Sequence, residues 1–251
     1  MNWVLNTIAS GELMAQESFG QLDIIGSVKG LGFDNIELRS EYFDGSDQEL
    51  VDLKAANKEA GLTVFLSVPA PLFEEGLVNP ALENFFELAQ AVGAVQLKVN
   101  LGAYSPETVA QDMILVYNLI DRFGISLALE NDNTQATGAS NHFKAFLQDN
   151  GNDKVGMCFD VGNFLYFDED PVAAVKNVLP LVHYVHLKQV EQATNTSLAG
   201  LSVGDVDIVA VLKEIDPAIP VAIECQYKAS DIAEVEGQIK NDIENILSGL
   251  N

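Results

Sequence analysis

The sequence predicts a single (β/α)8 barrel over residues 1–251, and three observations carry this prediction. The 251 residues are 48% hydrophobic with Gly and Pro spread along the whole chain, so one large α/β core can be buried. Strand-like runs are separated by helical stretches, as in a parallel sheet. Four late runs end in metal-binding residue types at intervals of 30 (160 − 130), 26 (186 − 160) and 38 (224 − 186) residues, near the roughly 30 residues of one barrel unit.

The first half of the chain contains four strand and helix units. Glycines follow or close three of the helical stretches, at Gly30, Gly61 and Gly93, as they commonly do at helix ends. Ser105 is expected to cap the fourth helix. In order, the expected elements are strand 2–8, helix 16–30, strand 33–39, helix 47–60, strand 62–68, helix 80–92, strand 94–100 and helix 106–123.

The second half supplies four more units. The strands are expected at ISLALE, VGMCFD, LVHYVH and VAIE, with helices at 141–148, 171–179, 206–215 and 232–247. Because this makes eight strands separated by helices, the sheet is expected to close into a barrel.

Alternation within these strands predicts which side chains point inward, since neighbouring residues of a strand face opposite sides. In ISLALE, Glu130 shares a side with Ala128 and Ser126, and the bulky residues take the other side. The same sorting applies to Asp160 in VGMCFD and Glu224 in VAIE, so the acids are expected to face the barrel interior. His186 shares its side with Tyr184 and Val182, a less regular pattern, so its placement rests on its position at the strand end.

Glu130, Asp160, His186 and Glu224 are therefore predicted to meet on one rim of the barrel, where the active site of this fold lies. Three carboxylates and an imidazole form an oxygen-rich set suited to one divalent metal, Mn or Mg above all, with Co or Zn as the other metals considered.

Polar residues also alternate inward on the earlier strands. Glu37 and Arg39 alternate with Ile36 and Leu38 in the strand 33–39. The strand 94–100 has a second polar series, Gln96, Lys98 and Asn100, and Asn6 and Ser67 of two other strands are expected to join it. Burying an unpaired polar group costs about 1–3 kcal/mol, so such a ring predicts a solvated substrate pocket. Two alternatives stay open: an internal Glu37–Arg39 ion pair, and Lys98 as a solvated strand end.

Charge and composition restrict the partners. With 13 basic and 37 acidic residues, the net charge of −24 argues against binding to nucleic acid or to an anionic membrane. The start lacks the features of a signal peptide and no apolar run reaches 18 residues, so a cytoplasmic location is expected. Cys158 and Cys225 form no CxxC motif and are expected to be buried free thiols.

The stretches GFDNIELR, ALENDN, FDVGN, HLK and AIECQ, in this order, resemble the xylose isomerase-like TIM-barrel superfamily of sugar isomerases and epimerases. The resemblance implies that Glu130, Asp160, His186 and Glu224 bind one divalent metal. Two positions depart from the family pattern. Asn163 stands where a His is common, and it can hydrogen-bond a hydroxyl but cannot carry a proton; Gln189 stands where HLKD has Asp.

The implied function is a metal-dependent isomerase or epimerase acting on a sugar, a polyol or a small hydroxy-carbonyl compound. Glu130 and Glu224 are the expected proton-transfer residues, since a carboxylate on each side of a carbon can take and return a proton. Arg39, Lys98, Asn163 and Lys188 are the expected substrate-binding residues.

Other functions remain as alternatives: an inosose-type dehydratase, a non-catalytic sugar-binding relative, and a nuclease of the superfamily. The chain has only three His and a net charge of −24, and both facts argue against the nuclease. His142 and His183 are expected to be structural or exposed, and a symmetric homo-oligomer is a possible assembly.

Overall fold

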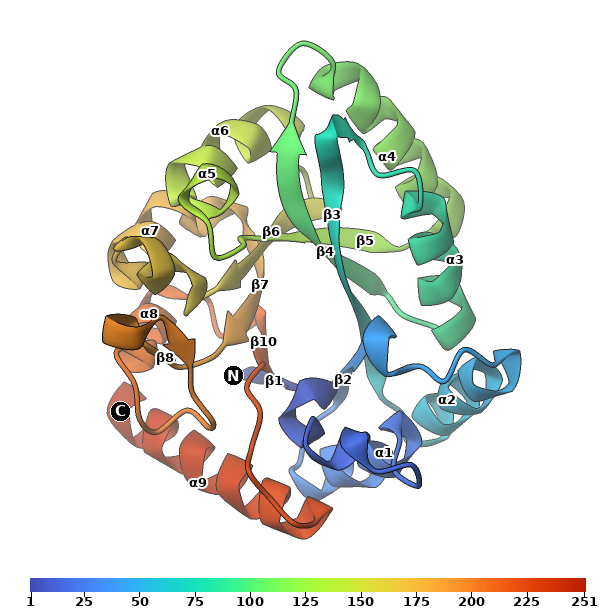
Figure 1. The fold of residues 1–251 in the computed structure, drawn as a ribbon, viewed down its shortest axis with the longest axis vertical. Coiled ribbons are helices and arrows are strands. Elements are labelled where there is room, and N and C mark those ends of the chain that lie inside the picture. The colour runs from blue at the N-terminus through green and yellow to red at the C-terminus, as the bar shows by residue number, and fades with distance from the viewer.

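Eight parallel strands close into a barrel in the computed structural model, which describes residues 1–251, so the predicted fold class is confirmed. Around the barrel the strand order is β1-β10-β7-β6-β5-β4-β3-β2, as Figure 1 shows from one end. The barrel strands are β1 (Asn2–Asn6), β2 (Asn35–Arg39), β3 (Thr63–Val78), β4 (Gln96–Tyr104), β5 (Ser126–Glu130), β6 (Val155–Asp160), β7 (Val182–Leu187) and β10 (Pro220–Ile223). A small antiparallel ribbon of β8 (Val190–Glu191) and β9 (Thr196–Ser197) follows β7.

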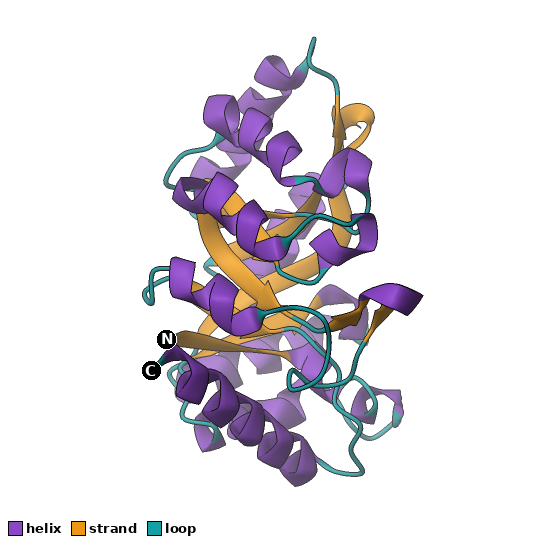
Figure 2. Ribbon diagram, turned by 90° about the vertical axis from the view of Figure 1, so that its left-hand side faces the viewer, coloured by secondary structure: helices purple, strands orange, loops and turns teal.

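Helices surround the strands on all sides (Figures 1 and 2). They are α1 (Gln21–Gly30), α2 (Asp47–Glu59), α3 (Leu82–Val92), α4 (Val109–Phe123), α5 (Gln135–Gly138), α6 (Ser140–Asn150), α7 (Pro171–Val178), α8 (Ile208–Glu214) and α9 (Ile232–Leu250). None of them combines the length and the apolar character that crossing a membrane demands.

Two helices begin three or more residues later than the sequence pattern predicts. Helix α1 begins at Gln21 instead of residue 16, because the Asp23 carboxylate accepts the backbone N–H of Gly20 and starts the helix there. Helix α4 begins at Val109, and the expected cap at Ser105 is wrong: its hydroxyl donates to Glu107 instead.

Strands β3 and β4 extend well past the ends predicted for them. Their backbones continue to pair beyond the barrel, at Phe73 with Gly102 and at Gly76 with Tyr104, and form the arm that reaches the top of Figure 1. Gly102 has a φ of +72°, and a Cβ there would lie 2.1 Å from the Phe73 carbonyl oxygen. Only glycine therefore allows this close pairing.

The apolar core has two layers. A cluster of 59 buried residues fills the space between strands and helices. Inside the barrel lies a separate cluster of six, Val4, Phe65, Ala128, Cys158, Tyr184 and Ala222. Three of these are the same-side strand neighbours of Glu130, Asp160 and Glu224, so the predicted alternation is confirmed. The inner layer closes the barrel beneath these acids.

Candidate active site

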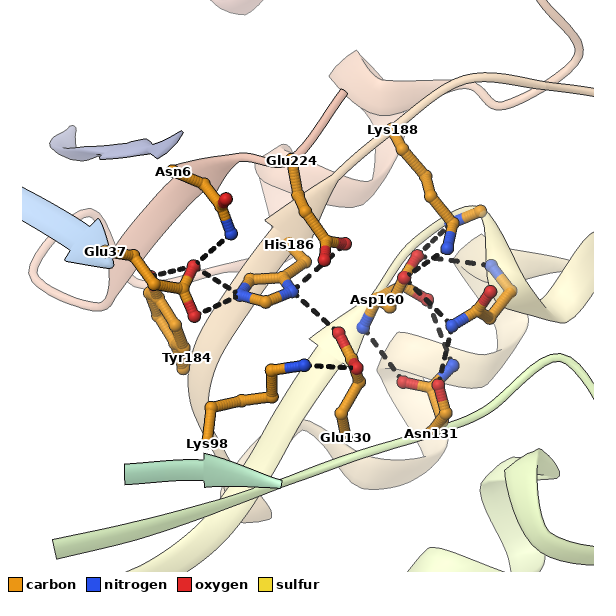
Figure 3. Close-up of polar contacts among 12 residues, drawn as sticks. Asn6, Glu37, Lys98, Glu130, Asn131, Asp160, Tyr184, His186, Lys188 and Glu224 are labelled. Carbon is orange, nitrogen blue, oxygen red and sulfur yellow. Dashed lines mark hydrogen bonds and ion pairs between the residues drawn. The ribbon is translucent and has the colours of Figure 1, made fainter. Parts of the chain in front are cut away.

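The four residues predicted as metal ligands converge at the carboxyl-terminal rim of the barrel (Figure 3). Asp160 and His186 are register partners on β6 and β7, and the Glu224 N–H donates to the Leu187 carbonyl directly after β10. Carboxylate oxygens of Glu130, Asp160 and Glu224 lie within 4.8 Å of one another. His186 Nδ1 lies 2.7 Å from Glu130 Oε1 and 3.2 Å from Glu224 Oε2.

The His186 ring is oriented by a buried acid on the opposite side of the barrel. Its Nε2 lies 2.9 Å from Glu37 Oε2, and both side chains are fully buried. Glu37 also accepts hydrogen bonds from Asn6 Nδ2 at 2.6 Å and from the Tyr184 hydroxyl at 3.0 Å. A carboxylate behind a histidine is the usual way to fix a metal-binding imidazole, and here it directs Nδ1 toward Glu130 and Glu224.

The ion pair considered between Glu37 and Arg39 is wrong. Arg39 Nη1 lies 2.7 Å from Glu224 Oε1, and its Nε lies 2.6 Å from Glu41. Arg39 comes two residues after Glu37 along β2 and therefore lies nearer the rim, while Glu37 lies deeper, beside His186.

Two lysines form ion pairs with Glu130 and Asp160. Lys98 Nζ lies 2.7 Å from Glu130 Oε2, and the Lys98 side chain is only 2% exposed, so a solvated strand end is excluded for it. Lys188 Nζ lies 2.6 Å from Asp160 Oδ2. Both pairs place a cation beside a carboxylate with little access to water, where charge pairs interact strongly.

These cations decide the protonation of the carboxylates. Burial alone would raise the pKa of Glu130, but Lys98 and His186 together outweigh burial and lower this pKa to about 2. Burial likewise opposes ionisation of Glu224, yet His186, Lys188 and Arg39 hold its pKa well below the usual range. At Asp160 burial prevails and raises the pKa to about 6, although Lys188 lowers it. All three acids are therefore ionised at neutral pH.

Two asparagines hold Asp160 in place. Asn163 Nδ2 donates to Asp160 Oδ2 at 2.9 Å and to the Asn131 carbonyl at 2.7 Å. The side chain of Asn131 exchanges two hydrogen bonds with the backbone of Asp160, at 2.9 and 3.0 Å. Sequence reasoning missed Asn131, although the polar run ENDN directly after a buried strand is a signal for it.

A polar cavity opens beside the cluster. Its volume is about 240 Å³ and none of its lining residues is hydrophobic; they include the four predicted substrate-binding residues, Arg39, Lys98, Asn163 and Lys188. A second cavity of about 500 Å³ shares Arg39, Lys188 and Glu224 with the first and reaches Ser197, Gln226 and Lys228. The cluster therefore faces a polar cavity that adjoins a larger, partly apolar one, a setting suited to a small hydroxylated molecule.

The cluster fits a divalent metal, because two of its carboxylates still have free lone pairs that could bind a cation. A carboxylate offers about four lone-pair positions, and Glu130 and Glu224 each receive at most two donors. The pKa of His186 is well above its usual value, since the acids around it overcome burial, so metal binding would displace its proton. Three carboxylates and one imidazole suit Mn, Mg, Co or Zn.

A second group of ligand types, Glu130, Cys158 and His186, also lies within 4.8 Å. Burial raises the pKa of the Cys158 thiol to about 12, and Cys158 does not line either cavity at the rim. The carboxylate group is therefore the better metal site.

The other two histidines lie away from the cluster. The His183 ring lies against Gly156 and lines a cavity with Gln96 and Ser126, at the amino-terminal end of the barrel. His142 on α6 packs against Tyr104 of the arm, with ring centroids 5.0 Å apart and the ring planes tilted by 31°.

Comparison with known proteins gives one family and many similar folds. A family model described as xylose isomerase-like TIM barrel matches residues 25–247. No curated protein matches the chain.

Three solved structures illustrate the similarity of the fold. An L-ribulose 3-epimerase is 18% identical with a TM-score of 0.72, over 98% of this chain and 93% of that one. The 3-keto-D-glucoside 4-epimerase of E. coli is 16% identical with a TM-score of 0.70, over 99% of both chains. A probable 3-DHS dehydratase of Bacillus anthracis is 16% identical with a TM-score of 0.70, over 100% of both. At these identities the likeness concerns the fold.

Proposed function

Because this chain belongs to the xylose isomerase-like TIM-barrel family, we propose that it is a divalent-metal-dependent isomerase or epimerase of a sugar, a polyol or a small hydroxy-carbonyl compound. The observation that supports this most is the approach of Glu130 and Glu224 to within 4.8 Å, both ionised and both facing one polar cavity. Solved structures of the same fold include sugar epimerases, which is consistent with a sugar as the substrate. A cytoplasmic location stays a prediction.

Glu130, Asp160, His186 and Glu224 would hold the metal, which when bound would draw electrons from a substrate carbonyl and make the neighbouring C–H more acidic. The protein supplies the groups that hold the substrate and move the proton. Arg39, Lys98, Asn163 and Lys188 line the cavity and carry N–H donors for substrate oxygens.

Proton transfer is assigned to the two glutamates. They come from strands β5 and β10, which two other strands separate in the barrel, so their carboxylates approach the cavity from different sides. One carboxylate takes the proton from the carbon next to the carbonyl. Return of a proton by the other to the opposite face of the same carbon gives an epimer. Return to the former carbonyl carbon gives an isomer, with the proton of the neighbouring hydroxyl passing to the former carbonyl oxygen. Asn163 cannot carry a proton, so its assigned role is substrate binding alone.

Dehydration is the second candidate. It begins with the same proton removal, and the Lys188 ammonium, which lines both cavities, can protonate a departing hydroxyl. One structural neighbour is described as a probable 3-DHS dehydratase. Product analysis separates the two candidates, since only dehydration releases water and leaves an unsaturated product.

The experiment is proton exchange in D2O with a panel of ketoses and inososes, in the presence of Mn²⁺ and followed by NMR. We expect the protein to incorporate deuterium at the carbon next to the carbonyl of one panel member, and Glu130→Gln and Glu224→Gln to abolish this while circular dichroism stays unchanged. Glu87→Gln, on the exposed face of α3 and away from both cavities, is the matched control and should retain exchange. Full exchange by both active-site variants would exclude the assigned bases. No exchange by any panel member with a metal bound would favour a non-catalytic sugar-binding relative.

A further inference from the structure

Every acceptor position of Asp160 is already taken. Its Oδ1 accepts the backbone N–H groups of Gly162 and Asn163, at 2.9 and 3.2 Å. Its Oδ2 accepts Asn163 Nδ2 at 2.9 Å and lies 2.6 Å from Lys188 Nζ. Four donors fill the roughly four lone-pair positions that a carboxylate has.

Asp160 differs in this respect from the other two acids of the cluster. Glu130 receives His186 Nδ1 and Lys98 Nζ, one on each oxygen, while Glu224 receives Arg39 Nη1 and lies 3.2 Å from His186 Nδ1. Both glutamates keep free positions for a cation. For Asp160 to bind the same cation, one of its four donors must leave.

Lys188 is the donor that can leave. Two of the other donors are backbone N–H groups at the start of the short helical segment Asn163–Phe167, and the third is the buried Asn163 amide, which is also tied to the Asn131 carbonyl. The Lys188 side chain is 17% exposed and borders both cavities, and its four-carbon stem is flexible. Its departure leaves the three other bonds of Asp160 intact.

We propose that Lys188 and the divalent metal compete for Asp160, so that metal binding releases the Lys188 ammonium into the cavity as a donor to the substrate. The proposal rests on the proposed function, because it requires a metal at this cluster. It predicts an order of binding in which the metal precedes the substrate. Without the metal, Lys188 holds Asp160 and is not available to a substrate oxygen.

Lysine acetylation, with each site quantified by mass spectrometry, tests the release in the unaltered protein. In chelator-treated protein we expect Lys188 to react much more slowly than the exposed Lys176, and saturation with Mn²⁺ to raise its rate toward that of Lys176. Lys176 itself should not change, and the buried Lys98 should stay unreactive in both states. An unchanged or lower rate at Lys188 with Mn²⁺ bound would overturn the proposal.

Calorimetric titration with Mn²⁺ at pH 8 gives a second readout. Lys188→Gln removes the competitor and should tighten Mn²⁺ binding about tenfold, the lower end for a hydrogen bond between charged groups. Lys228→Gln removes the same charge from the larger cavity, where Lys228 has no ion pair, and should change the affinity far less. Equal or weaker binding by Lys188→Gln would contradict competition. If Mn²⁺ does not bind the unaltered protein at all, the proposed function fails together with this inference; if Mn²⁺ binds while Lys188 is unaffected, only the inference fails.

Discussion

Replacing Lys98 by Met tests how far the buried ion pair with Glu130 stabilises the barrel. The two charged groups lie 2.7 Å apart, and their side chains are 2% and 7% exposed. Met has a similar length and no charge, so the substitution leaves the Glu130 carboxylate buried without its closest cation. Loss of one partner of a buried pair is strongly destabilising for this reason.

The expected magnitude follows from the pKa of Glu130, which Lys98, with help from His186, holds at about 2 against an ordinary value of 4.5. A difference of this size corresponds to about 3 kcal/mol of stability at pH 7. Glu130 has a lowered pKa in the folded state, so this stability is present above pH 4.5 and is lost as the pH falls toward 2. For a protein of this size, about 3 kcal/mol lowers the thermal midpoint by roughly 6–12 °C.

The assay is differential scanning calorimetry of metal-free protein at pH 7 and again at about pH 3, where the difference between Lys98→Met and the unaltered protein should be smaller. Combining Lys98→Met with Glu130→Gln should restore most of the loss, since no unpaired charge then remains. Lys154→Met breaks the exposed pair with Asp121, whose side chains are 50% and 69% exposed, and should cost less than about 1 kcal/mol. If Lys98→Met lowers the midpoint no more than Lys154→Met does, the reasoning about the buried pair is refuted.

Three further predictions concern the same cluster and the buried Asp242 of α9. Glu37→Gln loosens the His186 ring and should weaken Mn²⁺ binding about 10- to 100-fold by calorimetry, whereas Tyr184→Phe should have a much smaller effect; equal effects would argue against the role of Glu37. The affinity for Mn²⁺ should rise between pH 5 and 7, because Asp160 loses its proton around its pKa of about 6; an affinity that falls over this range would be inconsistent with Asp160 as a ligand. Asp242→Ala leaves the Leu201 N–H and the Tyr227 hydroxyl without their acceptor. It should lower the free energy of unfolding by about 2 kcal/mol, and an unchanged thermal midpoint would show that these bonds do not stabilise the fold.

The barrel and its rim of acids were predictable because both depend on local sequence patterns. A period of two within a strand fixes the side on which Glu130, Asp160 and Glu224 lie, and their places at strand ends put them on one rim. Both inferences need only a few neighbouring residues, so tertiary structure did not have to be known.

The partners of these residues could not be predicted in the same way. Glu37 meets His186 across the barrel, although the two residues are 149 positions apart in the sequence. Arg39 pairs with Glu224 because of its position along β2, nearer the rim than Glu37. Such choices are set by the closure of the barrel and the stagger of its strands. The lengths of β3 and β4 were missed for a related reason, because the arm is held by pairing between the two strands beyond Val68.

Anomalous diffraction at the manganese absorption edge, from crystals grown with Mn²⁺, decides whether the four rim residues share one cation. We expect a single strong peak bounded by oxygens of Glu130, Asp160 and Glu224 and by His186 Nδ1. No peak at this position, or a peak held by other residues, would contradict the proposed site and the chemistry assigned to it.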